Sequence, residues 1–377
     1  MKIGFFLIAF GFTFLMAFYV SLRGWQALLP LRNVGIWYLI ANVVLFIVML
    51  VGMMARGSMP PTFAKTITFI GFSYMLVMIY LLLSFLMTDV IRLANLLVHF
   101  APAGMKVFRF WAFLLTLSGI AVAMVIGNYK FNHPEIVTLD IRPEKPLQNK
   151  QLKIVAASDI HLGVSIDKKR LKKYVDLINA QHPDIVLFAG DVSDNATLPL
   201  IHQQMAEELL QIKAPLGVYA ISGNHEYYAE NPYSTAEYLK TAGIITLRDS
   251  AVLINNSFYI VGRDDKTNHK RKELAEVVTG LDKNKPLILL DHQPYHLQDA
   301  QKNGIDLQIS GHTHNGQFFP GNLFVKRMYE LGHGYRKIGK THYYVSSGLG
   351  LWGPQYRIGT QSELVVINLS YKTLYWG

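Results

Sequence analysis

The sequence predicts an α-helical membrane domain of four spans followed by an α/β domain. Two observations carry this prediction. Four apolar stretches lie within the first 130 residues, and each is near the roughly 20 residues that a spanning helix needs. From residue 151 onward, short β-rich runs alternate with helical patterns, which is typical of α/β domains. A hydrophobic fraction of 51% in a chain of 377 residues is high for a soluble protein and agrees with the membrane part.

Four transmembrane helices are expected, at residues 3–21, 34–54, 67–87 and 110–127. The first stretch follows Lys2, as a signal peptide would, but no small-residue cleavage site follows it and three more spans do. We therefore expect it to be retained. Apart from Arg109 at the edge of the fourth stretch, the spans carry no charge of the kind that marks a transport pathway. The helices are accordingly interpreted as an anchor or a lipid-facing platform.

The charge of the chain is unevenly distributed. Residues 1–130 contain 9 Lys/Arg and one acid, a net +8 of the formal +10, whereas the remaining 27 Lys/Arg and 25 Asp/Glu leave only +2. The α/β domain thus lacks the charge asymmetry of a nucleic-acid binder, and we expect no nucleic-acid partner. The chain contains no cysteine, so any metal must be held by oxygen and nitrogen atoms.

The loop charges bear on membrane orientation. An even number of spans places both ends of the helical domain on one side. The basic residues of the first and third loops are Arg23, Arg32, Arg92, Lys106 and Arg109, against Lys2, Arg56 and Lys65 on the other side. Because basic loops favour the cytoplasm, a multi-pass cell-membrane protein with its α/β domain outside the cytoplasm is expected. Lys130, Arg142 and Lys145 after the last span nearly cancel this preference.

Three segments are predicted: a membrane domain at 1–130, a proline-containing linker at 131–150 and the α/β domain at 151–377. Helical patterns cover residues 166–181 and 199–213. In the first of these helices one face is apolar, formed by Leu171, Tyr174, Val175 and Ile178. Strands are expected at residues 153–158, 184–189, 217–221, 257–261, 286–290, 306–309, 343–346 and 363–369.

Potential metal ligands follow five of these strands. The run IVAASDIH at residues 154–161 is too short and too β-branched for a helix and predicts a buried strand that ends in a carboxylate and an imidazole. Open α/β sheets build their sites at such strand ends. The strand-end residues are Asp159 and His161, Asp191, Asn224 and His225, Asp291 and His292, then His312 and His314. Glycines precede Asp191, Asn224 and His312, where a tight turn allows close approach of the backbone.

Carboxylate, carboxamide and imidazole ligands without sulfur suit Mn, Fe or Zn ions. So many ligands exceed the needs of one tetrahedral ion and suit two divalent ions that share a bridging carboxylate. Two metals about 3.5 to 4 Å apart can hold a hydroxide as nucleophile and clamp phosphoryl oxygens during in-line displacement. Hydrolysis of a phosphoester is therefore the predicted chemistry.

The ordered motifs resemble those of the calcineurin-like metallophosphoesterase superfamily. They are Asp159-Ile160-His161, Gly190-Asp191, Gly223-Asn224-His225-Glu226, His292 and Gly311-His312-Thr313-His314. The resemblance covers roughly residues 150–370 and is closest to the membrane-associated branch with N-terminal transmembrane helices, which shares a late stretch like SSGLGLWGPQYR at residues 346–357. It implies a two-sheet β sandwich flanked by helices, with the metals at strand ends on one edge.

The resemblance also implies a role for each motif residue. Asp159, His161 and His314 would hold one metal, and Asn224, His292 and His312 the other. Asp191 would bridge the two metals. His225 would be no ligand but a catalytic residue that protonates or stabilises the leaving oxygen, for which a protonated imidazole is physically suitable.

Three further positions near these motifs have less defined roles. Asp194 is interpreted either as a residue that orients the site from behind or as an ordinary turn or helix cap. Arg357 is interpreted either as a bidentate phosphate ligand or as part of a surface salt bridge. Asn315 stands where the family usually has glycine, and asparagine tolerates the same positive φ.

A membrane lipid or lipid-linked phosphoester is the leading substrate hypothesis, because the anchor would raise the concentration of the site near headgroups. An aromatic run could cap acyl chains or belong to the core: Phe318, Phe319, Phe324, Tyr329, Tyr335, Tyr343 and Tyr344. Phosphodiester and phosphomonoester hydrolysis both remain open. One alternative is an anchored enzyme for a soluble nucleotide or phosphoprotein, and another is a transport or sensor module regulated by a phosphate-binding domain.

Overall fold

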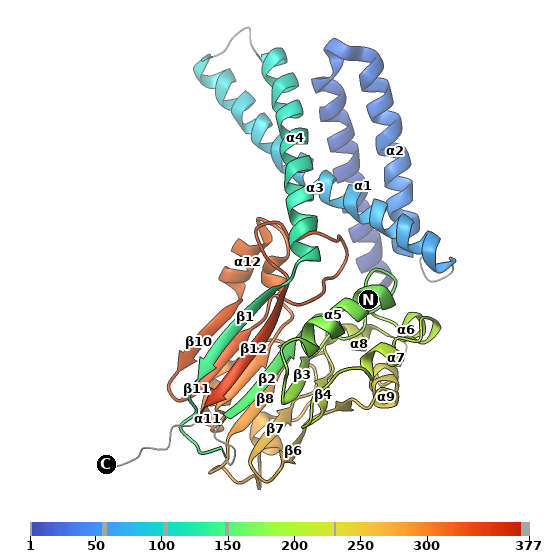
Figure 1. Ribbon diagram of the computed structural model, residues 1–377. Coiled ribbons are helices and arrows are strands. Elements are labelled where there is room, and N and C mark those ends of the chain that lie inside the picture. Colours follow the sequence, from blue (N-terminus) through green and yellow to red (C-terminus); the bar gives the residue numbers. More distant parts are fainter. Residues whose placement is uncertain (1, 55–58, 101–104, 148–150, 230, 371–377) are drawn as a thin grey trace. The chain divides into compact units, whose positions relative to one another are not determined.

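The structure is a computed structural model that describes residues 2–54, 59–100, 105–147, 151–229 and 231–370 (Figure 1). Arg56 of the second loop and residues 148–150 of the expected linker lie outside these ranges. The chain folds as two compact units. The helical unit comprises Met1–Ile126 with Gly353–Gln355, and the α/β unit comprises Gly127–Trp352 with Tyr356–Gly377.

The helical unit contains the four expected spans. They are α1 (Lys2–Ala27), α2 (Arg32–Met54), α3 (Pro61–Val98) and α4 (Met105–Asn132), with the short helix η1 (Leu29–Leu31) between the first two. All four are long and apolar enough to cross a membrane, and most of their apolar surface is not covered by protein. The 38 residues of α3 would extend about 57 Å, well beyond the roughly 30 Å of a hydrocarbon core.

A charged cluster joins helices α1 and α3 just outside the segments that the sequence predicts as spans. It arises because α3 continues past Met87. Asp89 forms ion pairs with Arg23 of α1 and with Arg92 at 2.9 Å, and it accepts a hydrogen bond of 2.7 Å from the Tyr19 hydroxyl. The charges are thus paired near one end of the unit rather than spread along a pathway, which agrees with an anchor.

The α/β unit is a sandwich of two six-stranded sheets, which confirms the predicted fold class. The first sheet has the order β1 (Glu135–Ile141), β12 (Glu363–Ser370), β2 (Gln151–Ala157), β3 (Ile185–Ala189), β4 (Val218–Ile221), β5 (Ile245–Thr246). The second has the order β10 (Gly334–Ile338), β11 (Thr341–Val345), β9 (Leu307–Ser310), β8 (Leu287–Leu290), β7 (Phe258–Gly262), β6 (Ser250–Ile254). Strands β2 to β5 are mutually parallel, as are β7, β8, β9 and β11.

Side-chain alternation along the strands creates the core. In β2, Ile154 and Ala156 point between the two sheets, whereas Val155 and Ala157 belong to the core on the outer face of the first sheet. The helices that contribute to that outer core are α5 (Lys168–Asn179), α6 (Leu198–His202), α7 (Ala206–Leu209) and α9 (Ser234–Thr241), while α8 (Asn224–Tyr228) follows β4 directly. Helices α10 (Leu274–Val277) and α11 (Leu297–Lys302) pack on the other face of the second sheet, and α12 (Gly321–Met328) lies between β9 and β10 in the chain. Because both faces of the second half of β2 are covered, residues 154–157 are continuously apolar.

Some local predictions are confirmed and others differ. Helix α5 buries the four predicted residues, Leu171, Tyr174, Val175 and Ile178. The helix expected at 199–213 is instead the two short helices α6 and α7, because Gln204 between them has a left-handed φ of 52°. Within the segment expected as a linker, β1 pairs with β12 and extends the first sheet.

Candidate metal centre

Five strands from both sheets end at one edge of the sandwich and carry the candidate site. From the first sheet, β2 leads to Asp159 and His161, β3 leads to Asp191, and β4 leads to Asn224 at the start of α8. From the second sheet, β8 and β9 lead to the remaining histidines, His292, His312 and His314. The carboxyl ends of these parallel strands meet at the same edge, as expected for an α/β site.

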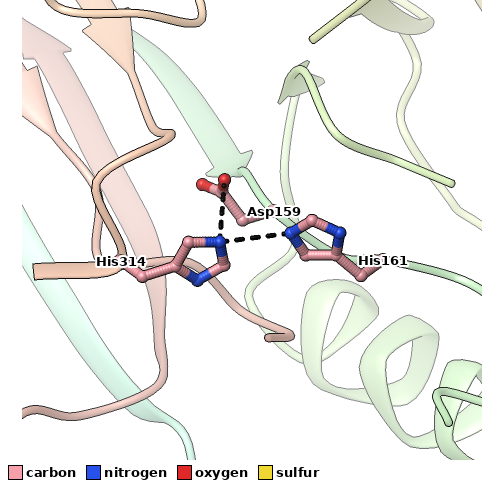
Figure 2. Close-up of side chains that lie close together, drawn as sticks. All are labelled: Asp159, His161 and His314. Atoms are coloured by element: carbon pink, nitrogen blue, oxygen red, sulfur yellow. Dashed lines mark hydrogen bonds and ion pairs between the residues drawn. The ribbon is translucent and has the colours of Figure 1, made fainter. Parts of the chain in front are cut away.

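Asp159, His161 and His314, here called the first group, face one another. The His314 Nε2 atom lies 3.4 Å from Asp159 Oδ1 and 3.2 Å from His161 Nε2 (Figure 2). One potential ligand atom from each residue lies within 4.8 Å of the others. Asp159 and His161 are completely buried at the end of β2, while His314 comes from η3 (His314–Gly316) after β9. This spacing is suitable for one metal ion.

Asn224, His292 and His312, here called the second group, converge in the same way. Asn224 Oδ1 lies 3.2 Å from His292 Nε2 and 2.7 Å from His312 Nδ1. On the opposite side of its ring, His292 donates from Nδ1 to the Ala189 carbonyl at 2.8 Å. Because a carbonyl oxygen can only accept, this bond leaves the lone pair on Nε2 when the imidazole is neutral. Such a hydrogen bond behind a histidine is common at metal sites.

Asp191 lies between the two groups. Its Oδ2 atom is 3.2 Å from His292 Nε2 in the second group and 3.8 Å from His161 Nε2 in the first. Its Oδ1 atom accepts a hydrogen bond of 2.9 Å from the His225 backbone N–H. The seven residues that the resemblance assigns as ligands therefore form one contiguous cluster, with the Asp191 carboxylate between its two groups.

The backbone at the site is unusual. Left-handed φ values occur at five ligand candidates: Asp159 (53°), His161 (53°), Asp191 (51°), His312 (70°) and His314 (49°). Such a conformation costs a non-glycine residue about 1–3 kcal/mol and persists where the surrounding structure enforces it, often at functional sites. Asn315 shares the conformation with φ 48°, so asparagine fills the usual glycine position as predicted.

Close backbone approach explains two of the glycines beside the ligands. A Cβ atom on Gly223 would lie 2.2 Å from Asp191 Oδ1, and one on Gly311 would lie 2.3 Å from Asp159 Oδ2. Neither side chain could remain in place beside a methyl group at that distance. The glycines thus let the two carboxylates enter the centre.

Burial and neighbouring charges shift the pKa values of the four histidine ligand candidates. Burial, together with the neighbouring His225 and His314, lowers the pKa of His161 to about 3, and burial with Arg357 holds the pKa of His314 well below its usual value. Burial also lowers the pKa of His312 in the second group. These three shifts favour the neutral imidazole, which is the form that binds metal. Burial acts to lower the pKa of His292 too, but the Asp191 carboxylate outweighs it and raises that pKa well above the usual value. Within the described residues, the Nδ1 atoms of His161 and His314 have no hydrogen-bond partner.

His225 lies at the rim of this cluster. Its ring is 4.5 Å from that of His161 and 6.4 Å from that of Trp352, and its Nδ1 atom is 3.3 Å from Asp194 Oδ1. Burial acts to lower the pKa of His225, but the carboxylates of Asp194 and Asp191 outweigh it and raise the pKa. By distance alone, His225 also belongs to a possible metal-holding group with His161 and Asp191. The position of Asp194 favours the interpretation in which it orients the site from behind.

Comparisons with known proteins place the chain in a family. The model of the calcineurin-like phosphoesterases matches residues 152–316. An uncharacterized metallophosphoesterase of Campylobacter jejuni is 35% identical over 269 residues, which cover 69% of each chain. Another, of Aquifex aeolicus, is 32% identical over 67% of this chain and 98% of its own. The chain belongs to the calcineurin-like phosphoesterase family.

Membership makes this phosphoesterase a metal-dependent phosphoester hydrolase, as the sequence predicted. The family uses divalent metals, and the oxygen and nitrogen donors of the described clusters fit such ions. A transmembrane protein with a metallophosphoesterase domain from Danio rerio is 31% identical over 68% of this chain and 63% of its own. That similarity and the four apolar helices indicate a multi-pass membrane protein.

Arg357 has a setting in the phosphoesterase that neither sequence interpretation anticipated. Its side chain is completely buried. The guanidinium donates to the backbone carbonyls of His314 (3.0 Å), Gly348 (3.0 Å) and Gly350 (2.6 Å), and to the Ser362 hydroxyl (3.2 Å). Four of the five N–H groups are therefore engaged within the protein. Arg357 therefore forms no surface ion pair and cannot bind a phosphate through two N–H groups. It supports the backbone that carries His314.

Glu226 is a structural residue of the site to which sequence reasoning assigned no role. It is buried and accepts backbone hydrogen bonds from Ser193 at 2.9 Å and Gly223 at 2.8 Å. Burial and the charge of Asp191 raise its pKa to about 7. Glu226 thus joins the turn after β3 to the turn after β4. In the sequence, a role for Glu226 at the site was indicated only by its position directly after Asn224 and His225 in the motif.

Proposed function

We propose that this protein hydrolyses a membrane lipid or lipid-linked phosphoester at a centre of two divalent ions. The first group would hold one ion and the second group the other, with Asp191 contacting both. The observation that carries this proposal is the position of Asp191 between two converging ligand sets. Mn, Fe and Zn all suit the oxygen and nitrogen donors.

A pair of bound ions would activate water as a nucleophile and neutralise charge on the phosphoryl oxygens. The chain itself would supply the proton for the leaving group. Because Asp194 faces Nδ1 of His225, the proton to be donated is the one on Nε2. The raised pKa of His225 favours the imidazolium form that a departing alkoxide needs.

A lipid substrate is supported by the anchor and by part of the aromatic run. Four spans keep the enzyme at the bilayer, where headgroups are concentrated. Phe319 and Phe324 are 50% and 65% exposed and are available to a lipid. Tyr343 and Tyr344 are only 1% and 2% exposed, so the interpretation of these two residues as part of an acyl-chain cap is wrong.

The membrane orientation proposed here places the catalytic unit outside the cytoplasm. The basic residues Arg23, Arg92 and Arg109 all occur at the helix ends that carry the first and third loops, and basic loops favour the cytoplasm. Because the chain has no native cysteine, a single Leu210→Cys variant can report the orientation. A membrane-impermeant maleimide should label this cysteine in intact cells. Labelling only after lysis would contradict the proposal and place the catalytic unit in the cytoplasm.

The substrate class can be tested by parallel turnover assays. The purified, metal-loaded protein would be offered detergent-solubilised phospholipids and lipid phosphomonoesters beside aryl phosphates and cyclic nucleotides. We expect a higher kcat/KM for a lipid substrate than for the soluble substrates. Comparison of the phospholipid diesters with the lipid phosphomonoesters shows which type of ester bond is hydrolysed. Brisk turnover of soluble substrates without any lipid turnover would contradict a lipid substrate and favour a nucleotide or phosphoprotein.

A further inference from the structure

An exposed apolar surface lies on and beside α12. We call it the α12 surface and define it by Phe319, Leu323, Phe324 and Met328, whose side chains are 50%, 53%, 65% and 69% exposed. Four large apolar side chains thus lie open within ten consecutive residues. Soluble surfaces rarely concentrate apolar groups in this way unless something binds them. Lys326 and Arg327 lie in the last turn of the same helix.

This surface is connected to the rim of the metal centre. The segment that leads into it begins at η3 with His314. Gln317, within that segment, donates from Nε2 to the Trp352 carbonyl at 2.8 Å, and the half-exposed Trp352 ring lies 6.4 Å from His225. At the other end, the Tyr329 ring lies 6.3 Å from that of His312. The segment that carries the α12 surface is therefore in contact, at both of its ends, with residues beside His225 and His312.

The same surface is connected to the last apolar span. Gly127 belongs to the candidate span Met105–Asn132 and, as part of the α/β unit, accepts a hydrogen bond of 2.9 Å from the Arg357 backbone N–H. The next residue, Ile358, accepts one of 2.7 Å from the Phe319 backbone N–H. Two backbone hydrogen bonds within the α/β unit thus link Gly127, in the C-terminal part of the last candidate span, to the first residue of the α12 surface.

We propose that the α12 surface inserts into the headgroup and acyl boundary of the bilayer in which the protein is anchored. Its occupant is the lipid surface itself rather than a partner protein. Apolar side chains beside basic ones are the composition of an interfacial helix, and Lys326 and Arg327 add attraction to anionic headgroups. Insertion would bring the rim residues His225 and Trp352 to the level of the lipid phosphates. This role would bring the site to its substrate, and it therefore rests on the proposed hydrolysis of a lipid.

The absence of native cysteine makes a depth measurement direct. Phe324→Cys and Met328→Cys in the full chain would carry an environment-sensitive fluorophore in vesicles of phosphatidylcholine with a minor share of phosphatidylglycerol. Leu210→Cys is the matched control, because Leu210 is a similarly exposed apolar residue, 60% open, that follows α7. Nitroxide-bearing lipids should quench the two α12 labels several-fold more than the control. Equal quenching of all three labels would overturn the proposal.

A second measurement separates this proposal from the substrate proposal. In the Phe324→Ser, Met328→Ser double variant, turnover of a vesicle-borne lipid substrate should fall several-fold, while turnover of a soluble aryl phosphate stays unchanged and shows that the fold is intact. Quenching of the α12 labels in a protein that hydrolyses no lipid would support insertion and contradict the lipid substrate. Lipid hydrolysis by a protein whose α12 labels remain exposed to water would support the lipid substrate and contradict insertion.

Discussion

The two ligand groups of the metal centre contain similar residues but are supported differently. In the second group, a hydrogen bond from His292 Nδ1 to the Ala189 carbonyl orients the ring. In the first group, the Nδ1 atoms of His161 and His314 have no hydrogen-bond partner within the described chain. Here the bond from Arg357 to the His314 carbonyl holds the backbone that carries the His314 ring instead. His292 is therefore oriented through its side chain and His314 through its backbone.

The histidines also differ in pKa. Burial lowers the pKa values of His161, His314 and His312, whereas the Asp191 carboxylate raises that of His292. Because Asp191 lies beside one histidine of each group, variants can be chosen that should affect both groups, neither group or only one.

Removal of the shared charge should have the largest effect. In Asp191→Asn we expect both metals to be depleted and turnover to be lost, because each group loses its common carboxylate. Metal content by elemental analysis is the measurement. Asp306→Asn is the matched control, since Asp306 is also a buried acid but pairs with Lys145 at 2.6 Å, away from the ligands. Full metal content in Asp191→Asn would rule out the bridging role.

A change at the rim should spare both groups and still slow the reaction. His225→Ala should retain two metals yet lose about 10² to 10⁴ in rate for substrates with poor leaving groups. The loss should be much smaller for a nitrophenyl leaving group, which departs without a proton. Steady-state kinetics on the two substrate types provide the test. Equal losses on both would argue against proton donation by His225.

Arg357 offers a way to weaken one group only. In Arg357→Met, the carbonyls of His314, Gly348 and Gly350 lose their donor, so the backbone under the first group should loosen. We expect the affinity for one of the two metals to fall about 10- to 100-fold, as for other supporting residues of metal sites. Calorimetric titration of metal into the apo-protein should show one weakened step. Two equally weakened steps would mean that Arg357 supports the whole edge of the sandwich.

The smallest expected effect is a shift of a pH profile. The carboxylates around His225 raise its pKa, so the imidazolium persists to higher pH and activity should fall as the pH rises through that pKa. Asp194→Asn removes one of these carboxylates and should move the alkaline limb of kcat/KM to lower pH. Metal content should not change. A limb that stays in place would show that another group controls it.

The buried parts of the sandwich were the most predictable. Residues 154–157 of β2 and the whole of β3 and β8 are apolar on both faces, and this pattern is readable without knowledge of their neighbours. Strands β5, β6 and β10 were missed because they are short or partly exposed, and β1 was read as a linker because it precedes a proline-containing stretch. The break between α6 and α7 depends on the single left-handed residue Gln204, which no periodicity reveals.

The sequence by itself determined which atoms are available to the centre, because the ligand types and their places after strands are properties of the chain. It also determined the four spans, since length and hydropathy are sufficient for them. Only the tertiary structure decided that Arg357 is buried behind His314 and that Phe324 is exposed while Tyr343 is not. The physical reason is that burial and hydrogen bonding depend on neighbours that are distant in sequence, which no local pattern contains.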